Sequence, residues 1–207
     1  MSSAPPPSPL DLLRDRRAMV DTGVGPLAFV IVNAVAGLHA AAAVAVGISL
    51  VLMVERLARR RPVINAISGL IGTGIAVFIA LRSGRPEGYF VPRMLYQAAL
   101  ALAFGGSVLF RRPLAGYIIV AIYRAPLSWL EDRRVRRVCS ELTLAWAVLF
   151  GLRAAIYAVL IALGQAGWLA AASIVIGWPA FLLLGWACYR YAPRRLDQLG
   201  APQPRPA

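Results

Sequence analysis

The stretch LTLAWAVLFGLRAAIYAVLIAL, residues 142–163, carries a single charged side chain, Arg153. A helix of about 20 apolar residues spans the ~30 Å hydrocarbon core of a bilayer, so this stretch predicts a membrane-crossing helix. The rest of the chain agrees, because 59% of its 207 residues are hydrophobic, whereas soluble domains contain about 45–50%. We therefore expect an all-α fold, a polytopic transmembrane helical bundle.

Further uncharged runs on both sides of this stretch set the number of crossings. Val24–Val54 has the length for a pair of short helices with a turn at Gly37, and Gly164–Gly167 is the natural turn between the last two crossings. Pro113–Tyr123 is too short to span and predicts a re-entrant or interfacial segment. With single crossings at Pro62–Leu81, Met94–Phe110 and Trp168–Tyr189, the sequence predicts about six crossings in all.

The charges orient these crossings. All 22 basic residues are arginine, and a bundle with both ends in the cytoplasm places seventeen of them on that side. Residues 1–19 predict a disordered, Pro-rich cytoplasmic leader, 20–195 a single transmembrane domain, and 196–207 a disordered cytoplasmic tail. A cleavable signal peptide ending near Ala36 is the alternative interpretation of the start.

The composition also excludes several kinds of site. Without lysine the chain has no P-loop lysine and no Schiff base. The single histidine, His39, and two distant cysteines, Cys139 and Cys188, predict no metal site, and we expect no cofactor. The arginines form short clusters between apolar runs instead of one continuous face, which argues against nucleic-acid binding.

Arg153 is the main candidate for a functional residue. A charge in the middle of a membrane helix costs at least ~2.5–3.5 kcal/mol and requires a partner. Trp146, Phe150, Arg153 and Tyr157 follow helical spacing and predict one stripe facing the interior. Three interpretations stay open here: a structural polar contact, a ligand or water-lined site, and snorkelling. For the ligand site we select Arg153, Tyr157 and Trp146.

A second candidate site lies in the loop that the topology places outside. Arg82, Arg85 and Glu87, with Arg93 nearby, predict a vestibule for a phosphate or carboxylate group. A solvated turn between two helices is the alternative interpretation.

A third candidate site, on the cytoplasmic side, consists of four arginines interleaved with apolar residues. These predict contacts with anionic lipid headgroups, and an acidic protein partner is the alternative. The four residues are Arg133, Arg134, Arg136 and Arg137.

An ordered set of landmarks extends from about Val20 to Arg195. It contains Val20–Gly23, Arg59–Pro62 with Ser68-Gly69, Ala80–Arg85 with Tyr89-Phe90, Arg111–Leu114, the Trp146 to Tyr157 stripe, and Gly177 with Pro179. This set resembles an actinobacterial family of integral membrane proteins, domain of unknown function 3159. A fainter likeness to intracellular septation protein A, whose family is linked to cell division and envelope maintenance, implies such a role in a bacterial plasma membrane.

From these observations we expect a non-catalytic envelope or division-associated membrane protein. Its partners would be membrane lipids, in particular anionic ones, together with a second copy of the chain or another membrane protein. The alternatives are a small channel or carrier for an anion or anionic lipid, and a membrane-embedded isoprenoid or lipid enzyme such as a small terpene cyclase. For the enzyme, Glu55 or Glu141 would serve as the acid.

Overall fold

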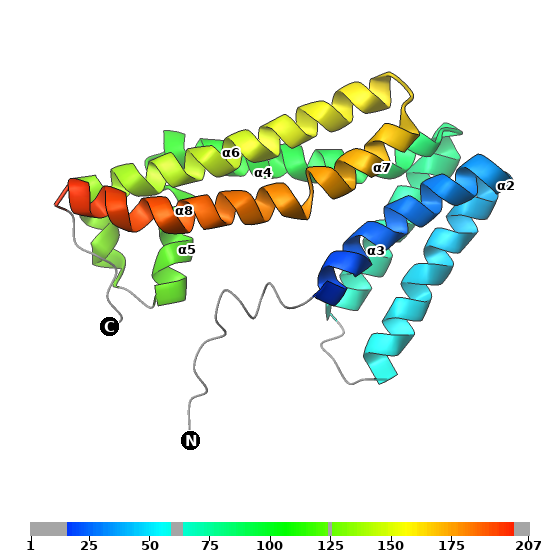
Figure 1. Cartoon of the computed structure of the whole chain (residues 1–207), viewed down its shortest axis with the longest axis horizontal. Helices are drawn as coiled ribbons and strands as arrows, with labels where there is room; N and C mark the ends of the chain where they lie inside the picture. Colours follow the sequence, from blue (N-terminus) through cyan, green and yellow to red (C-terminus); the bar gives the residue numbers. More distant parts are fainter. Residues whose placement is uncertain (1–15, 59–63, 124–125, 201–207) are drawn as a thin grey trace. The chain divides into compact units, whose positions relative to one another are not determined.

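The computed structural model describes residues 16–58, 64–123 and 126–200, and every regular element within them is a helix (Figure 1). The all-α prediction is thus confirmed for this part of the chain. The elements are α2 (Arg16–Ala58), α3 (Ile64–Ser83), the 3-10 helix η1 (Pro86–Phe90), α4 (Val91–Leu109), α5 (Leu114–Tyr123), the 3-10 helix η2 (Leu127–Glu131), α6 (Arg133–Ala162), α7 (Ala166–Val175) and α8 (Trp178–Gln198).

Contacts divide the chain into two compact units, where the sequence predicts one domain over 20–195. Unit 1 comprises the described residues of Met1–Tyr89 and Gln165–Ile174, and unit 2 those of Phe90–Gly164 and Val175–Ala207. α2 begins at Arg16 and α8 continues to Gln198. The predicted boundaries of leader, domain and tail stay predictions. The remaining residues of the predicted leader and most of the predicted tail lie outside the described residues.

Unit 1 is built on a helical hairpin. α2 doubles back at Gly37, whose φ of 82° and ψ of 174° interrupt the helix, as the sequence predicts (Figure 1). This region of backbone space is open essentially only to glycine. Phe29 stacks on Tyr89 at 4.2 Å, and the Ser49 hydroxyl lies 3.1 Å from the Thr73 hydroxyl on α3. The buried cluster between these helices consists of Phe29, Ala41, Ala42, Ala45, Val77 and Ala80.

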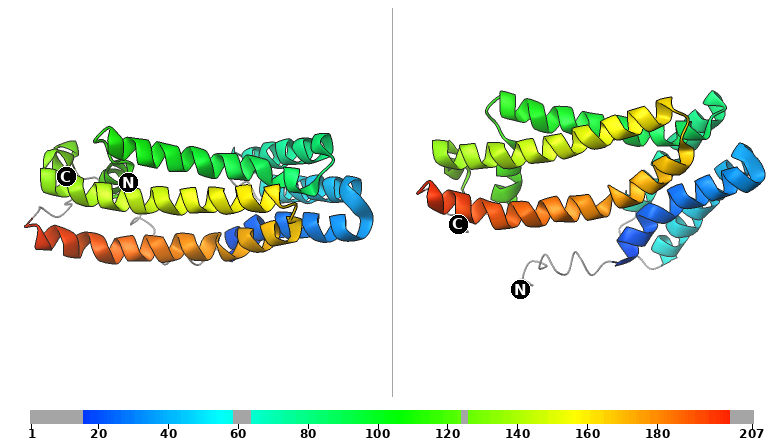
Figure 2. Two further views of the ribbon diagram at one scale, coloured as in Figure 1. Left: turned by 90° about the horizontal axis from the view of Figure 1, so that it is seen from above. Right: turned by 45° about the horizontal axis from the view of Figure 1, so that its top comes forward.

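Unit 2 is organised around α6. α4 runs antiparallel to α6, and small residues bring the two helices together: a Cβ added at Gly105 would lie 4.0 Å from Ala147, and one at Gly151 would lie 3.8 Å from Ala101. α8 and α5 also contact α6, and Figure 2 shows α4, α6 and α8 alongside one another. In unit 2, α4, α6 and α8 therefore lie side by side along roughly the same axis.

The short helix α5 leaves α4 at 94°. The Ser107 hydroxyl accepts the Leu114 amide at 3.2 Å, and the Thr143 hydroxyl of α6 accepts the Ala115 amide at 3.1 Å. These bonds satisfy amides at the beginning of α5, where no helical partner exists. If α4 crosses the membrane near its normal, α5 lies close to the membrane plane, in agreement with the predicted re-entrant or interfacial segment.

The described helices are compatible with a membrane protein. Three are long and apolar enough to cross a bilayer, within Pro26–Glu55, Arg133–Ala162 and Ala166–Gln198, and a fourth is added if the bent α4–α5 pair forms one span. Large apolar side chains such as Leu102, which is 77% exposed, face outward as lipid-facing residues do. The six crossings stay a prediction, because the first of these segments contains the Gly37 reversal and α3 supplies only a shorter apolar helix, Gly69–Ser83.

Candidate functional site

The candidate site of unit 2 follows from the register of α4 and α6. Phe104 meets Phe150 edge-on at 5.4 Å, and Ala101 faces Gly151. Because the two helices are antiparallel, the next turn of each brings the segment around Gln97 toward the segment around Arg153 and Tyr157. The predicted interior stripe is confirmed, since Phe150, Arg153 and Tyr157 are all buried.

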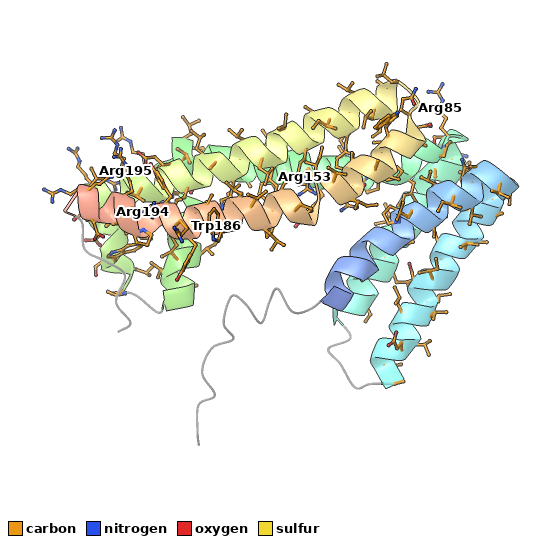
Figure 3. The ribbon with its side chains drawn as sticks, in the orientation of Figure 1. Arg85, Arg153, Trp186, Arg194 and Arg195 are labelled. Carbon is orange, nitrogen blue, oxygen red and sulfur yellow. The ribbon has the colours of Figure 1, made fainter. Side chains whose placement is uncertain are left out.

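Arg153 is a buried cation in the C-terminal half of α6 (Figure 3). It is 6% exposed, and its Nε is a buried donor without a hydrogen-bond partner in the protein. Its guanidinium hydrogen-bonds the side chain of Tyr157, one turn further along the same helix. An unsatisfied buried donor of a charged group costs more than the ~1–3 kcal/mol of a neutral one, so this atom is the least satisfied feature of the helix pair.

Two polar residues of α4 lie on the part of that helix that the antiparallel register brings toward Arg153. Gln97 is 5% exposed, and its Oε1 also lacks a hydrogen-bond partner. Arg93, one turn earlier, is half-buried and lies close enough for its positive charge to repel that of Arg153. A cluster of two guanidinium groups, an amide and a phenol is therefore rich in donors and carries net positive charge. We call Arg93, Gln97, Arg153 and Tyr157 the α4–α6 centre.

The predicted ligand residue Trp146 lies on the same stripe, two turns before Arg153. Its ring packs edge-on against the Phe181 ring of α8, with 4.6 Å between the ring centroids. Its ring is tilted against that of Phe150, with 5.8 Å between the centroids. At 1.5 Å per residue it is about 10 Å from Arg153 along the axis. Trp146 therefore forms part of the aromatic contact between α6 and α8 and does not join the α4–α6 centre.

The predicted outer vestibule is divided between the two units. Arg82, Arg85 and Glu87 belong to unit 1, and Arg93 belongs to unit 2. Arg82 and Arg85 are exposed, with Arg85 projecting away from the ribbon (Figure 3), while Glu87 is buried in η1. Their combination into one anion site stays a prediction.

The four arginines predicted to meet lipid headgroups lie on the first turns of α6. Arg133, Arg134 and Arg137 are exposed, and Arg136 is half-buried. Two of them have partners within the protein, because Arg134 donates to the Gly200 carbonyl at 3.1 Å and Arg137 lies 3.5 Å from Glu141. The surface is basic, and its contact with lipid stays a prediction.

Glu141 joins α6 to the end of α8. Its position beside arginine clusters predicts ion pairs, whereas its link to α8 is not predicted by the sequence. Its carboxylate accepts the Tyr191 hydroxyl at 2.8 Å and lies 3.6 Å from the Arg195 Nε. Arg190, close by on α8, lies over the Trp186 ring at 5.4 Å. Besides Arg137, one turn away, the partners of Glu141 are 50 and 54 residues away along the chain, and nothing in the local pattern marks these two. A carboxylate with two guanidinium partners favours a structural role for Glu141 over that of a catalytic acid.

Within the described residues there is no group of three or more His, Cys, Asp or Glu side chains that could hold a metal ion. The donors of the α4–α6 centre suit an anion instead.

Comparisons with known proteins identify one family. A family model described as "Protein of unknown function (DUF3159)" matches residues 15–197. The search of curated proteins found no match. The search of solved structures found none either.

Proposed function

The chain belongs to the DUF3159 family, and from that premise and the α4–α6 centre we propose that it is a non-catalytic membrane protein that binds an anionic group between its helices. The observation that supports this most directly is the buried Arg153 Nε without a hydrogen-bond partner, in a helix pair that holds a second guanidinium.

The chemistry of the centre selects the ligand class. A phosphate or carboxylate oxygen would accept from the Arg153 Nε and offset the repulsion between Arg93 and Arg153. Arginine keeps its proton at any physiological pH, so these two residues supply charge and hydrogen bonds and no proton transfer. The centre is therefore suited to binding and holding an anion more than to acid–base turnover.

The anion could be the headgroup of a membrane amphiphile or a free ion, and one experiment separates the two. The protein is purified in zwitterionic detergent, titrated with phosphatidylglycerol or with inorganic phosphate, and examined by native mass spectrometry. We compare wild type with Arg153→Gln, and use Arg194→Gln as the matched control because Arg194 is an exposed arginine of α8.

We expect Arg153→Gln to lower affinity by about tenfold or more, the effect of losing a hydrogen bond to a charged group, while Arg194→Gln changes it less than twofold. Binding of phosphatidylglycerol alone identifies an amphiphile, and competition by inorganic phosphate identifies a free anion. Equal affinity in wild type and Arg153→Gln would overturn the proposal.

The cellular setting is a further part of this proposal. The basic end of unit 2 supports a cytoplasmic position for that end in a bacterial plasma membrane, following the bias of arginine toward the inside. The septation-protein likeness supports a role in envelope or division machinery, acting with lipids, a second copy or another membrane protein. Altered cell length or septum placement on depletion, restored by wild type but not by Arg153→Gln, is the expected result; normal division on depletion would contradict it.

A carrier for the same anion is the second candidate function. It is favoured by the interrupted helix at Ile176–Gly177, between α7 and α8, because broken helices are frequent in transporters. Anion flux in proteoliposomes that disappears in Arg153→Gln would select this function; binding without flux would select the first.

A further inference from the structure

The corner between α4 and α5 is built with arginine at a position that usually requires glycine. The Arg112 amide donates to the Ser107 carbonyl at 2.8 Å, and the Arg111 amide donates to the Val108 carbonyl at 3.0 Å. These two bonds define a Schellman motif with Arg111 in the left-handed position, at φ 58°. Arg111 is the one described non-glycine residue with positive φ. Strain of this kind persists where the surrounding structure fixes the chain, and it concentrates at functional sites.

Beside this corner is an open, shallow pocket of about 650 Å³. Its walls combine one cation and two hydroxyl groups with apolar and aromatic surfaces: Ser107, Phe110, Arg112, Leu114 and Tyr117. The Ser107 hydroxyl is already engaged, since it donates to the Phe104 carbonyl and accepts the Leu114 amide. Arg112 is exposed and supplies the charge.

The apolar walls of the pocket belong to a surface that faces away from the protein. Phe110 is 78% exposed, and Tyr117 is also exposed. Aromatic rings beside arginines are typical of the boundary between hydrocarbon and headgroups. Other arginines of unit 2 gather at the neighbouring helix ends, at the beginning of α6 and the end of α8 (Figure 3). The corner therefore complements an anionic phospholipid, because it is cationic on one side and apolar on the other.

We propose that this corner pocket binds an anionic phospholipid, with Arg112 on the phosphate and with Phe110, Leu114 and Tyr117 against the beginning of the acyl chains. Charge complementarity selects the lipid, because the pocket contributes a guanidinium and no acidic side chain. α5 lies at 94° to α4. If α4 crosses the membrane near its normal, the headgroup would reach Arg112 from the aqueous side and the chains would pass Phe110 toward the hydrocarbon. The proposal is independent of the α4–α6 centre, which uses other residues.

The adjacent arginine provides a matched control. Arg111 and Arg112 are both exposed, but only Arg112 lines the pocket. The full chain is released from nanodiscs of equal parts phosphatidylglycerol and phosphatidylcholine, and the retained lipids are counted by native mass spectrometry. The variants are Arg112→Gln, Arg111→Gln and the uncharged change Tyr117→Ala, each checked for helix content by circular dichroism.

We expect wild type to retain phosphatidylglycerol in preference to phosphatidylcholine. Arg112→Gln should reduce that retention at least fivefold and Tyr117→Ala about threefold, whereas Arg111→Gln should change it less than twofold. Arg153→Gln should remove only an anion bound at the α4–α6 centre and should keep the phosphatidylglycerol that Arg112→Gln releases, so failure of the function proposed above is distinguishable from failure here. Equal losses in Arg111→Gln and Arg112→Gln would show diffuse surface charge and overturn the pocket, as would equal retention of the two lipids by wild type.

Discussion

Replacement of Arg153 by methionine should make the ligand-free protein more stable. Removing the guanidinium recovers a cost of at least ~2.5–3.5 kcal/mol for a charge in the middle of a membrane helix. The lost hydrogen bond to Tyr157 returns about 1.5 kcal/mol of that, because bonds to charged groups contribute ~1.5–3 kcal/mol. With the hydrogen bond at the lower end of its range, the difference is a gain of about 1–2 kcal/mol, as seen when buried charges are replaced by apolar side chains of similar volume.

The free energy of unfolding is measured in zwitterionic micelles by titration with urea, which carries no anion, and is read by circular dichroism. The anionic ligand should reverse the order of the two proteins, since it stabilises wild type and leaves Arg153→Met unchanged. Tyr157→Phe serves as the companion variant, because it removes the known partner of Arg153 and keeps the charge. A methionine variant less stable than ligand-free wild type by more than about 1 kcal/mol would mean that the guanidinium is satisfied within the protein, and would refute the reasoning.

Three further predictions use the same unfolding measurement. Glu141→Gln should lose about 0.5–1.5 kcal/mol, since its ion pairs are partly exposed, and 1 M salt should shrink the difference; an unchanged difference would mean that screening does not govern it. Gly88→Ala should cost about 1–3 kcal/mol, because the new Cβ would lie 2.9 Å from the Ala80 Cα, whereas Gly74→Ala has open space and should be neutral or stabilising; equal effects would contradict the packing. Arg111→Gly should gain about 0.5–1 kcal/mol by relieving the left-handed backbone, and a loss would show that its side chain stabilises the corner.

The features that the sequence predicts well are local ones. A glycine in the middle of an overlong apolar run indicates a reversal, and Gly37 provides it because its backbone occupies a region closed to other residues. The interior position of Phe150, Arg153 and Tyr157 follows from helical spacing alone. The short run Pro113–Tyr123 forms a separate ten-residue helix, α5, at a sharp angle to α4, and its re-entrant or interfacial position stays a prediction.

The features that escape prediction depend on residues far apart in the sequence. Trp168–Tyr189 reads as one uninterrupted crossing, yet the helix breaks at Ile176–Gly177, for which Gly177 and Pro179 are the local signals. Gln97 carries no pattern that links it to Arg153; only the antiparallel register of α4 and α6 does.

The contact between the beginning of α6 and the end of α8 determines which of the two buried clusters forms first during translation. Leu196, 3% exposed, belongs to the same buried cluster as Ala115, Trp129 and Leu142, so that cluster closes only when nearly the whole chain has left the ribosome. The cluster of unit 1 is complete by Ala80. Domains generally form in the order in which they are translated. A ribosome stalled soon after α3 would therefore already carry a packed hairpin, whereas α6 must wait for the last helix before Glu141 acquires two of its partners.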